Sequence, residues 1–329
     1  DAAPPNDAPR SPADAAPPND APRSPADAAP PAAGTPAAAP PAAGTPAAGT
    51  PAAGTPAIIE LRDVRASSGG FEILDGACVA FPEGLCSVVM GPAGSGKSTL
   101  LKVAAGLVVP DSGSVLYRGA DLARFGRKDE AAFRAATGFV FQDAALWADQ
   151  NILMNVTMPL RVHKAWLGPS AMAELARETL GRLGYDEGMA YRPAELSAGE
   201  QKLVSIARAV IHEPQIVLMD DPTASLDEDA AERVYALIAK LRERRRTVVI
   251  VANSSELAYR FADRLGIIKG GRLVAFGAYE ETVGAAEAAL SGSIARLKAR
   301  GERVAEPGRE RGPAPGLDAG SENSQAGDV

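Results

Sequence analysis

The chain has 329 residues, of which 46% are hydrophobic and 23% charged, and its formal net charge at pH 7 is −7. This negative charge argues against a general nucleic-acid-binding protein, which usually presents a basic face. No apolar run approaches the roughly 18 residues of a membrane-spanning helix, and no basic segment followed by an apolar one marks a secretory signal.

Residues 1–57 are of low complexity. The segment 1–13 recurs as 14–26, and a Pro-Ala-Ala-Gly-Thr unit then repeats up to Pro56. No branched aliphatic or aromatic residue occurs before Ile58, so this segment has nothing with which to build a core. We therefore expect a disordered, semi-extended tail, with binding to a proline-recognising partner as the alternative.

The folded domain is expected over residues 58–283. An alternating segment at 59–64, a glycine-rich turn at 67–70, and β segments at 71–74 and 77–81 predict a small antiparallel sheet. A turn at 110–113 and a short strand at 115–117 follow further along the chain. Cys78 and Cys86 lie in strand-like segments without metal-ligand spacing, so we expect buried free thiols.

The stretch with the clearest chemistry is Gly91-Pro92-Ala93-Gly94-Ser95-Gly96-Lys97-Ser98-Thr99. It lies between an apolar run at 85–90 and a helix-like run at 100–107, and it fits G-x-x-x-x-G-K-[ST] at every fixed position. Glycines let consecutive N–H groups point into one concavity, and the helix N-terminus adds partial positive charge. Lys97 can then reach the β- and γ-phosphates of a nucleotide, and Ser98 can bind Mg²⁺. The alternative is a glycine-rich surface turn.

Strands and helices alternate through the rest of the domain. Residues 129–193 are mainly helical in pattern, amphipathic helices are expected at 203–211 and 234–241, and buried strands at 216–219 and 247–251. A hairpin at 265–276 closes the domain. This order predicts a parallel sheet covered by helices. A helix is expected within 285–303, and a disordered tail from 306 onward.

Further motifs follow the P-loop, residues 91–99, in a fixed order: Phe139-Val140-Phe141-Gln142, Leu196-Ser197-Ala198-Gly199-Glu200-Gln201, a strand ending in Asp220-Asp221, and Ser225-Leu226-Asp227. Together they resemble the ATP-binding cassette (ABC) ATPase family over residues 58–276. The resemblance implies an α/β fold with a P-loop NTPase core and parallel sheet, a small N-terminal antiparallel β subdomain and a helical subdomain. It also implies ATP and Mg²⁺ as cofactors.

The resemblance assigns a role to each motif. Residues 91–99 would bind the phosphates of ATP, Asp220 would hold Mg²⁺ together with Ser98, and Gln142 would contact the metal or the attacking water. A helix start would hold the γ-phosphate of nucleotide on a second cassette through Ser197, Ala198, Gly199 and Glu200. An ordinary helix N-cap is the alternative for Ser197, and an ordinary strand-end carboxylate for Asp220.

Four positions depart from the family pattern. Asp221 stands where a catalytic glutamate is usual, Asn253 stands where a switch histidine is expected, and Ala198 replaces a glycine. The aromatic residue that often stacks on adenine near Ser68 is missing, with Phe71 as a substitute. Slow but useful ATP hydrolysis by a transport subunit is one hypothesis, and an ATP-binding regulatory or asymmetric partner with little turnover is the other. The two histidines, His163 and His212, are expected to be structural or surface residues.

The loop at 141–147, with residues 155–156 and 159–163, is similar to cassettes of Mce/Mla-type lipid transport systems. This similarity implies a second cassette, identical or not, a separate integral membrane permease, and an Mce-domain lipid-binding protein as partners. It places the chain in the cytoplasm on the inner face of the cell membrane, moving phospholipid. Cassettes of lipoprotein-release and cell-division complexes share parts of this loop and are the alternatives. A cassette of DNA repair or translation is disfavoured by the acidic charge, and we expect no nucleic-acid partner.

Overall fold

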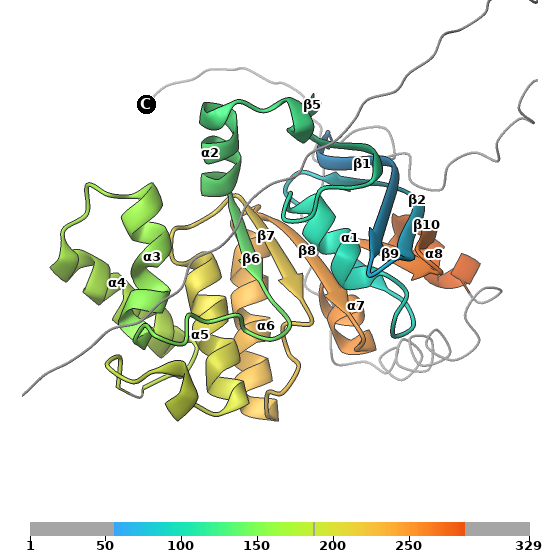
Figure 1. Cartoon of the computed structure of the whole chain (residues 1–329). Helices are drawn as coiled ribbons and strands as arrows, with labels where there is room; N and C mark the ends of the chain where they lie inside the picture. The colour runs from blue at the N-terminus through green and yellow to red at the C-terminus, as the bar shows by residue number, and fades with distance from the viewer. Residues whose placement is uncertain (1–55, 187, 287–329) are drawn as a thin grey trace, which may run out of the picture. The chain divides into compact units, whose positions relative to one another are not determined.

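The structure is a computed structural model and describes residues 56–186 and 188–286. Its strands form two sheets (Figure 1). The four-stranded sheet has the order β2 (Phe71–Pro82), β1 (Ala57–Ser68), β4 (Ser112–Tyr117), β5 (Ala120–Asp121), and its pairs are all antiparallel. The six-stranded sheet has the order β10 (Arg272–Ala278), β9 (Arg264–Lys269), β3 (Cys86–Met90), β8 (Thr247–Ala252), β7 (Ile216–Asp220), β6 (Thr137–Val140). Both predicted sheets are present.

Five strands of the larger sheet run parallel, and β10 is antiparallel to β9, as expected for the closing hairpin. Alternate residues of the central strands enter two apolar clusters on opposite faces. In β3, Val88 packs into one cluster and Val89 into the other. In β8, Ile250 and Val251 divide in the same way. Because both faces are buried, these strands are continuous apolar runs rather than alternating ones.

The helices are α1 (Lys97–Ala104), α2 (Arg127–Ala136), α3 (Ile152–His163), α4 (Pro169–Arg182), α5 (Ala198–Val210), α6 (Glu228–Glu243), α7 (Ser255–Phe261) and α8 (Tyr279–Ala286), with short 3₁₀ turns at Leu122–Arg124 and Pro193–Glu195. Helix α1 packs between the two sheets, since it contacts β1 and β2 on one side and β7 and β8 on the other (Figure 1). Helices α3, α4 and α5 pack against one another beside β6. None of the helices in the described ranges has the length and apolar character needed to cross a bilayer.

Three sequence expectations differ in detail. The two β segments at 71–74 and 77–81 form one strand, β2, in which Gly76 takes a positive φ of 68° near the register shifts with β1. Cys86 is buried, as predicted, and burial raises the pKa of its thiol, whereas Cys78 is only half-buried. Helix α8 overlaps the segment 285–303, where a helix is expected, only at residues 285–286, and residues 287–303 lie outside the described range. The predicted tail at 1–57 lies outside it up to residue 55, but Ala57 already begins β1, and the predicted tail from 306 onward lies wholly outside it.

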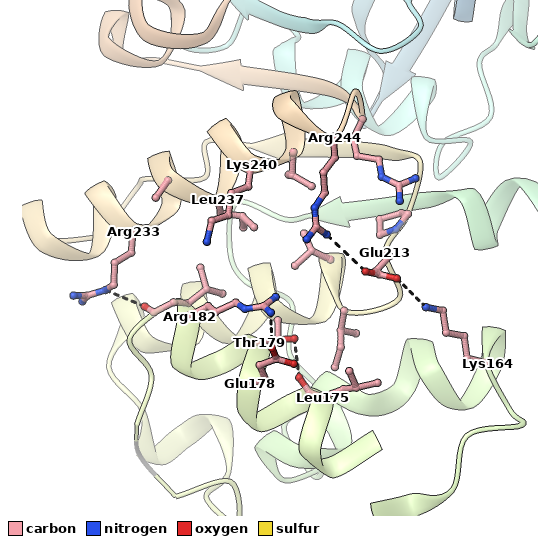
Figure 2. A pocket seen from close by; sticks show the side chains of 17 residues that line it. Lys164, Leu175, Glu178, Thr179, Arg182, Glu213, Arg233, Leu237, Lys240 and Arg244 are labelled. Atoms are coloured by element: carbon pink, nitrogen blue, oxygen red, sulfur yellow. Dashed lines mark hydrogen bonds and ion pairs between the residues drawn. The ribbon is translucent and has the colours of Figure 1, made fainter. Parts of the chain in front are cut away.

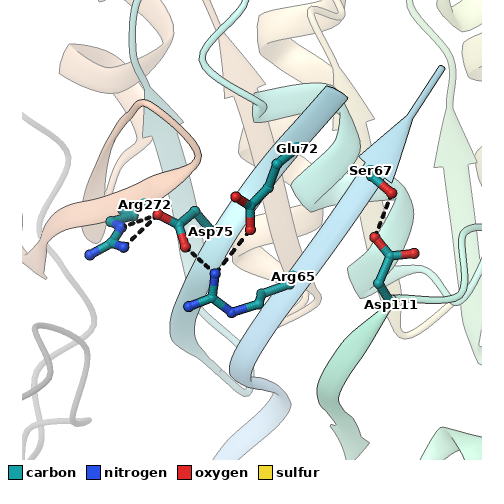
Figure 3. Close-up of polar contacts among 6 residues, drawn as sticks. All are labelled: Arg65, Ser67, Glu72, Asp75, Asp111 and Arg272. Carbon is teal, nitrogen blue, oxygen red and sulfur yellow. Dashed lines mark hydrogen bonds and ion pairs between the residues drawn. The ribbon is translucent and has the colours of Figure 1, made fainter. Parts of the chain in front are cut away.

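A polar network joins the small sheet to the β9–β10 hairpin (Figure 3). Asp75 of β2 accepts from Arg272 of β10 at 2.7 Å and also forms an ion pair with Arg65 of β1. The backbone N–H of Asp75 donates to the Gly271 carbonyl at 3.1 Å, and the Gly271 N–H donates to the Ser95 carbonyl at 3.2 Å. The small sheet, the hairpin and the glycine-rich loop before α1 therefore hold one another in place.

Candidate nucleotide-binding site

The stretch at 91–99 forms the predicted strand–turn–helix unit. Strand β3 ends at Met90, the loop follows, and α1 begins at Lys97. Gly94 and Gly96 have φ values of 75° and 95°, a region that residues with a Cβ seldom adopt. The N–H groups of the first turn of α1 have no partner within their own helix, so they are free to bind an anion at this end.

Close packing adds a second requirement for glycine. A Cβ at Gly91 would lie 2.2 Å from the backbone oxygen of Ile268 in β9, and one at Gly96 would lie 2.8 Å from the backbone oxygen of Ile73 in β2. The loop is thus pressed between the two sheets. Its position relative to the sheet edge is fixed by its neighbours as well as by its own turn.

Lys97 lies across the loop. Its Nζ donates to the carbonyl oxygens of Gly91 and Pro92, both at 2.8 Å. Burial lowers the pKa of the Lys97 ammonium, and the carboxylates of Asp221 and Asp220 oppose this effect. Within the described part of the chain, the buried Ser95 hydroxyl has no hydrogen-bond partner. A phosphate group at the loop would supply an acceptor for Ser95 and an anion for Lys97, so the residues fit a nucleotide phosphate.

Two hard oxygen donors meet beside the loop. The Ser98 hydroxyl donates to Asp220 Oδ1 at 3.0 Å, and Asp220 is only 3% exposed at the end of β7. Burial raises the pKa of the Asp220 carboxyl, and the Ser98 hydrogen bond opposes this rise. A divalent cation bound to these two oxygens would offset the cost of burying the carboxylate. The described residues contain no cluster of three or more His, Cys, Asp or Glu that could hold a metal ion.

Asp221 and Asn253 lie together, next to this oxygen pair. The Asn253 Nδ2 group donates to Asp221 Oδ2 at 2.8 Å, although the residues are 32 positions apart. Asp221 has a φ of 44°, and its N–H donates to the Val251 carbonyl at 2.9 Å, which extends the pairing of β7 with β8. Two of the four departures from the family pattern, Asp221 and Asn253, are therefore in direct contact.

Gln142 follows β6 with one residue between them, and its side chain is exposed. Its backbone oxygen accepts a 2.9 Å hydrogen bond from Lys202 of α5, and the Phe141 oxygen accepts another at 2.9 Å from the same ammonium. Lys202 also lies 3.4 Å from the Asp220 backbone oxygen. Sequence reasoning missed Lys202, and a lysine within the apolar face of α5 was the signal that was available.

The stretch Leu196–Gln201 begins helix α5, as predicted. The Ser197 hydroxyl accepts from the Glu200 N–H at 3.3 Å, and the Glu200 carboxylate accepts from the Ser197 N–H at 2.8 Å, which is a capping box. Ser197 and Ala198 are exposed. Among the described residues, no hydrogen bond or ion pair joins 197–200 to 91–99. Within one chain these two motifs are separate.

Phe71 begins β2 and is 78% exposed. It lies two residues before Ile73, whose backbone oxygen packs against Gly96, and residues i and i+2 share one face of a strand. The backbone of Phe71 is therefore about 7 Å along the strand from Ile73, which packs against the phosphate loop. At this location the exposed ring of Phe71 could stack on a nucleotide base.

A hollow separate from this site lies elsewhere in the domain (Figure 2). It has a volume of about 260 Å³ and lies between α4 and α6, with Lys164, Arg182, Lys240 and Arg244 among the residues that line it. None of the predicted site residues lines it. His163 and His212 lie near each other, with ring centroids 5.4 Å apart, and neither contacts Asp221, which agrees with a structural role.

Comparison with known proteins gives a consistent result. The ABC transporter family profile matches residues 74–224. The chain is 34% identical over 224 residues to the lipoprotein-releasing system ATP-binding protein LolD of Geobacter metallireducens, a match that covers 67% of this chain and 99% of LolD. It is 37% identical over 215 residues to the macrolide export ATP-binding/permease protein MacB 1/2 of Paracoccus denitrificans. That match covers 65% of this chain but only 32% of MacB.

The fold matches solved cassettes as well. The dimeric structure of MJ0796, a bacterial ABC transporter cassette, has 31% sequence identity and a TM-score of 0.63, covering 67% of this chain and 98% of that cassette. A dimeric post-hydrolysis structure of MJ0796 bound to ADP and Pi gives 29% identity and a TM-score of 0.62, with the same coverage. The sheet order, the P-loop and these matches show that the chain belongs to the ABC transporter family, as one of its ATP-hydrolysing, ATP-binding cassettes.

Proposed function

We propose that the chain binds Mg-ATP at residues 91–99 and hydrolyses it to drive a separate membrane permease. The observation that carries this proposal is the contact between Ser98 and Asp220, 3.0 Å apart beside the Lys97 ammonium. Two hard oxygen ligands beside one cation are the groups that a metal-bound polyphosphate requires, and this supports the proposal. Bound Mg²⁺ would neutralise charge on the phosphates, while Lys97 and the loop N–H groups hold them in place.

We further propose that two cassettes share two ATP molecules. Ser197 and Ala198 are exposed and Gly199 is half-buried at a helix N-terminus, and among the described residues none of them makes a hydrogen bond to its own P-loop, which supports their use toward nucleotide on a second chain. The dimeric form of MJ0796 is consistent with this arrangement. Whether the second cassette is identical is decided by the mass of the ATP-bound complex.

Hydrolysis is proposed to be slow. Asp221 has the charge of a catalytic glutamate but a side chain one methylene shorter, and its carboxylate accepts a hydrogen bond from Asn253 instead of an ionisable histidine. General-base positioning contributes roughly 10²–10⁴ in rate, so both changes bear on the hydrolytic step. The second candidate, a regulatory cassette that binds ATP with little turnover, is favoured by the same contact.

The proposed cargo is phospholipid, with the chain on the cytoplasmic face of the cell membrane beside a permease and an Mce-domain protein. The support is the similarity of the loop at 141–147 to Mce/Mla-type cassettes. Lipoprotein release is the second candidate, because the match to LolD covers 99% of that protein. Co-purification of the chain with its permease, followed by identification of the bound lipid or lipoprotein, distinguishes the two.

The nucleotide part of the proposal is tested with the purified full chain and a fluorescent ATP analogue in the presence of Mg²⁺. Saturable binding that is lost in Lys97→Ala supports the site. Equal binding by Lys97→Ala would overturn it, because the loop would then not be the place where the phosphates lie.

A further inference from the structure

Lys202 is a lysine buried inside the domain. It lies on α5, five residues after the Ser197 cap, and is 2% exposed. Its Nζ lies 2.9 Å from the backbone oxygens of Phe141 and Gln142 and 3.4 Å from that of Asp220. One ammonium group therefore joins the helix that begins with Ser197, the loop that carries Gln142, and the end of the strand that carries Asp220.

Two opposing effects act on the Lys202 ammonium. Burial lowers the pKa of the ammonium, but the carboxylates of Asp221, Asp220 and Asp143 act in the opposite direction. Three backbone oxygens and these carboxylates together replace the water that burial removes. Such a group is costly to bury, so its position requires the surrounding oxygens to stay where they are.

A second cation of α5 holds the same loop further along. The Arg208 guanidinium donates to the backbone oxygens of Ala144 and Ala145, both at 2.9 Å. Ala144 and Ala145 have positive φ values of 62° and 47°, so this part of the loop is in a strained conformation. Among the described residues, Arg208 forms no hydrogen bond with Phe141, Gln142 or Asp220, which makes it a matched control for Lys202.

We propose that Lys202 is a positioning residue for ATP hydrolysis, which sets the place of Gln142 relative to Asp220 by hydrogen bonds to the backbone on both sides. A general packing role would need only the aliphatic part of the side chain. The three oxygens converging on Nζ show that the donor end is used. The inference rests on the proposed function, since it assumes that Gln142 and Asp220 act on the same metal-bound nucleotide.

The consequence is a specific coupling between residues that do not touch through their side chains. Without the Lys202 ammonium donor, the backbone oxygens of Phe141 and Gln142 lose their hydrogen bonds to α5, and Gln142 loses its defined distance from Asp220. Displacements of about 1 Å in such positioning groups can reduce rates by about 100-fold. Because Lys202 acts through Gln142, removal of both should cost no more than removal of Gln142 alone.

The test is a double-variant cycle on the full chain with Lys202→Met, Gln142→Ala and the pair, measured as kcat and KM for Mg-ATP. Methionine keeps the length of lysine without a donor. We expect Lys202→Met to lower kcat about 10- to 100-fold, with the double variant no slower than Gln142→Ala. Arg208→Met combined with Gln142→Ala should instead multiply the two separate losses. Lys202→Gln, which keeps an N–H donor, should recover part of the rate and replaces methionine if that variant does not fold.

A second measurement does not depend on hydrolysis. Hydrogen exchange of the amides at 141–146 should become about ten-fold faster or more in Lys202→Met. The reason is that the loop, without the Lys202 hydrogen bonds, opens locally more often. Unchanged exchange in this variant, or losses by Lys202→Met and Gln142→Ala that multiply, would overturn the inference. If the unaltered chain binds no nucleotide, the proposed function fails, whereas the exchange result still decides whether Lys202 holds the loop.

Discussion

The side-chain amide of Asn253 donates a 2.8 Å hydrogen bond to the carboxylate of Asp221. Asp221 lies one residue past the end of β7, and Asn253 lies one residue past the end of the adjacent strand β8. Carboxyl ends of neighbouring parallel strands meet at one edge of a sheet, so both side chains reach the same place. We therefore expect the two residues to act on the nucleotide as a pair, and substitutions in them to be coupled.

The first prediction concerns this pair. We expect Asn253→His and Asp221→Glu together to raise kcat for ATP by about 10-fold or more, because proper general-base positioning contributes roughly 10²–10⁴ in rate. The rises in kcat of the two single variants should together be smaller than the rise of the double variant, because each single change breaks the existing hydrogen bond without forming a new one. Steady-state ATPase assays with Lys97→Ala as the background measure this. Rates of all three variants no higher than that background would contradict the hypothesis of slow catalysis limited by these residues.

The second prediction concerns the backbone at the same position. Asp221 has a positive φ of 44°, which aspartate tolerates better than longer side chains do. Asp221→Glu should therefore lower the free energy of unfolding by about 1 kcal/mol, while Asp221→Asn should change it less. Urea unfolding of the two variants decides this. A glutamate variant as stable as the unaltered chain would show that the positive φ at residue 221 does not disfavour the longer side chain.

Gly91 gives the third prediction. A Cβ at this position would meet the Ile268 backbone oxygen at 2.2 Å, so Gly91→Ala must displace the phosphate loop or strand β9. We expect a loss of about 2–3 kcal/mol in the free energy of unfolding and weaker nucleotide binding. Gly168→Ala is the matched control, because its φ is −69° and a Cβ there has no neighbour within 4 Å. Similar stability of both variants in urea titrations would argue against the packing of the loop described above.

The fourth prediction is a pH dependence of stability. Burial lowers the pKa of His212 from its ordinary value to about 4, and the nearby His163 and Lys164 act in the same direction. The folded state therefore favours the neutral imidazole more than the unfolded state does. The contribution of neutral His212 to the free energy of unfolding is thus fully present above about pH 6.5. It is lost as the pH falls toward 4, by at most about 3 kcal/mol. Urea unfolding from pH 7 to 4 should give a slope that His212→Phe reduces, and an unchanged slope would assign the acid sensitivity elsewhere.

Much of this site can be predicted from short stretches of the sequence. The loop at 91–99, the strand ends at Asp220 and Thr247–Ala252, and the helix start at Ser197 follow from spacing and residue type over short stretches. The contact between Asn253 and Asp221 depends on β7 and β8 being neighbours, which periodicity does not specify. The bond from Arg272 to Asp75 joins residues 197 positions apart, and nothing in either local pattern indicates it. Lys202 was missed for a related reason, since its partners are backbone oxygens that have no sequence pattern.

The most direct test of the central claim is the Mg²⁺-dependent hydrolysis of ATP by the purified full chain, compared with Lys97→Ala and with Lys128→Ala, an exposed lysine of α2. We predict saturable hydrolysis that rises more than linearly with protein concentration, is lost in Lys97→Ala, and is unchanged in Lys128→Ala. Hydrolysis that persists in Lys97→Ala, or that is the same with and without Mg²⁺, would contradict the site built from Lys97, Ser98 and Asp220.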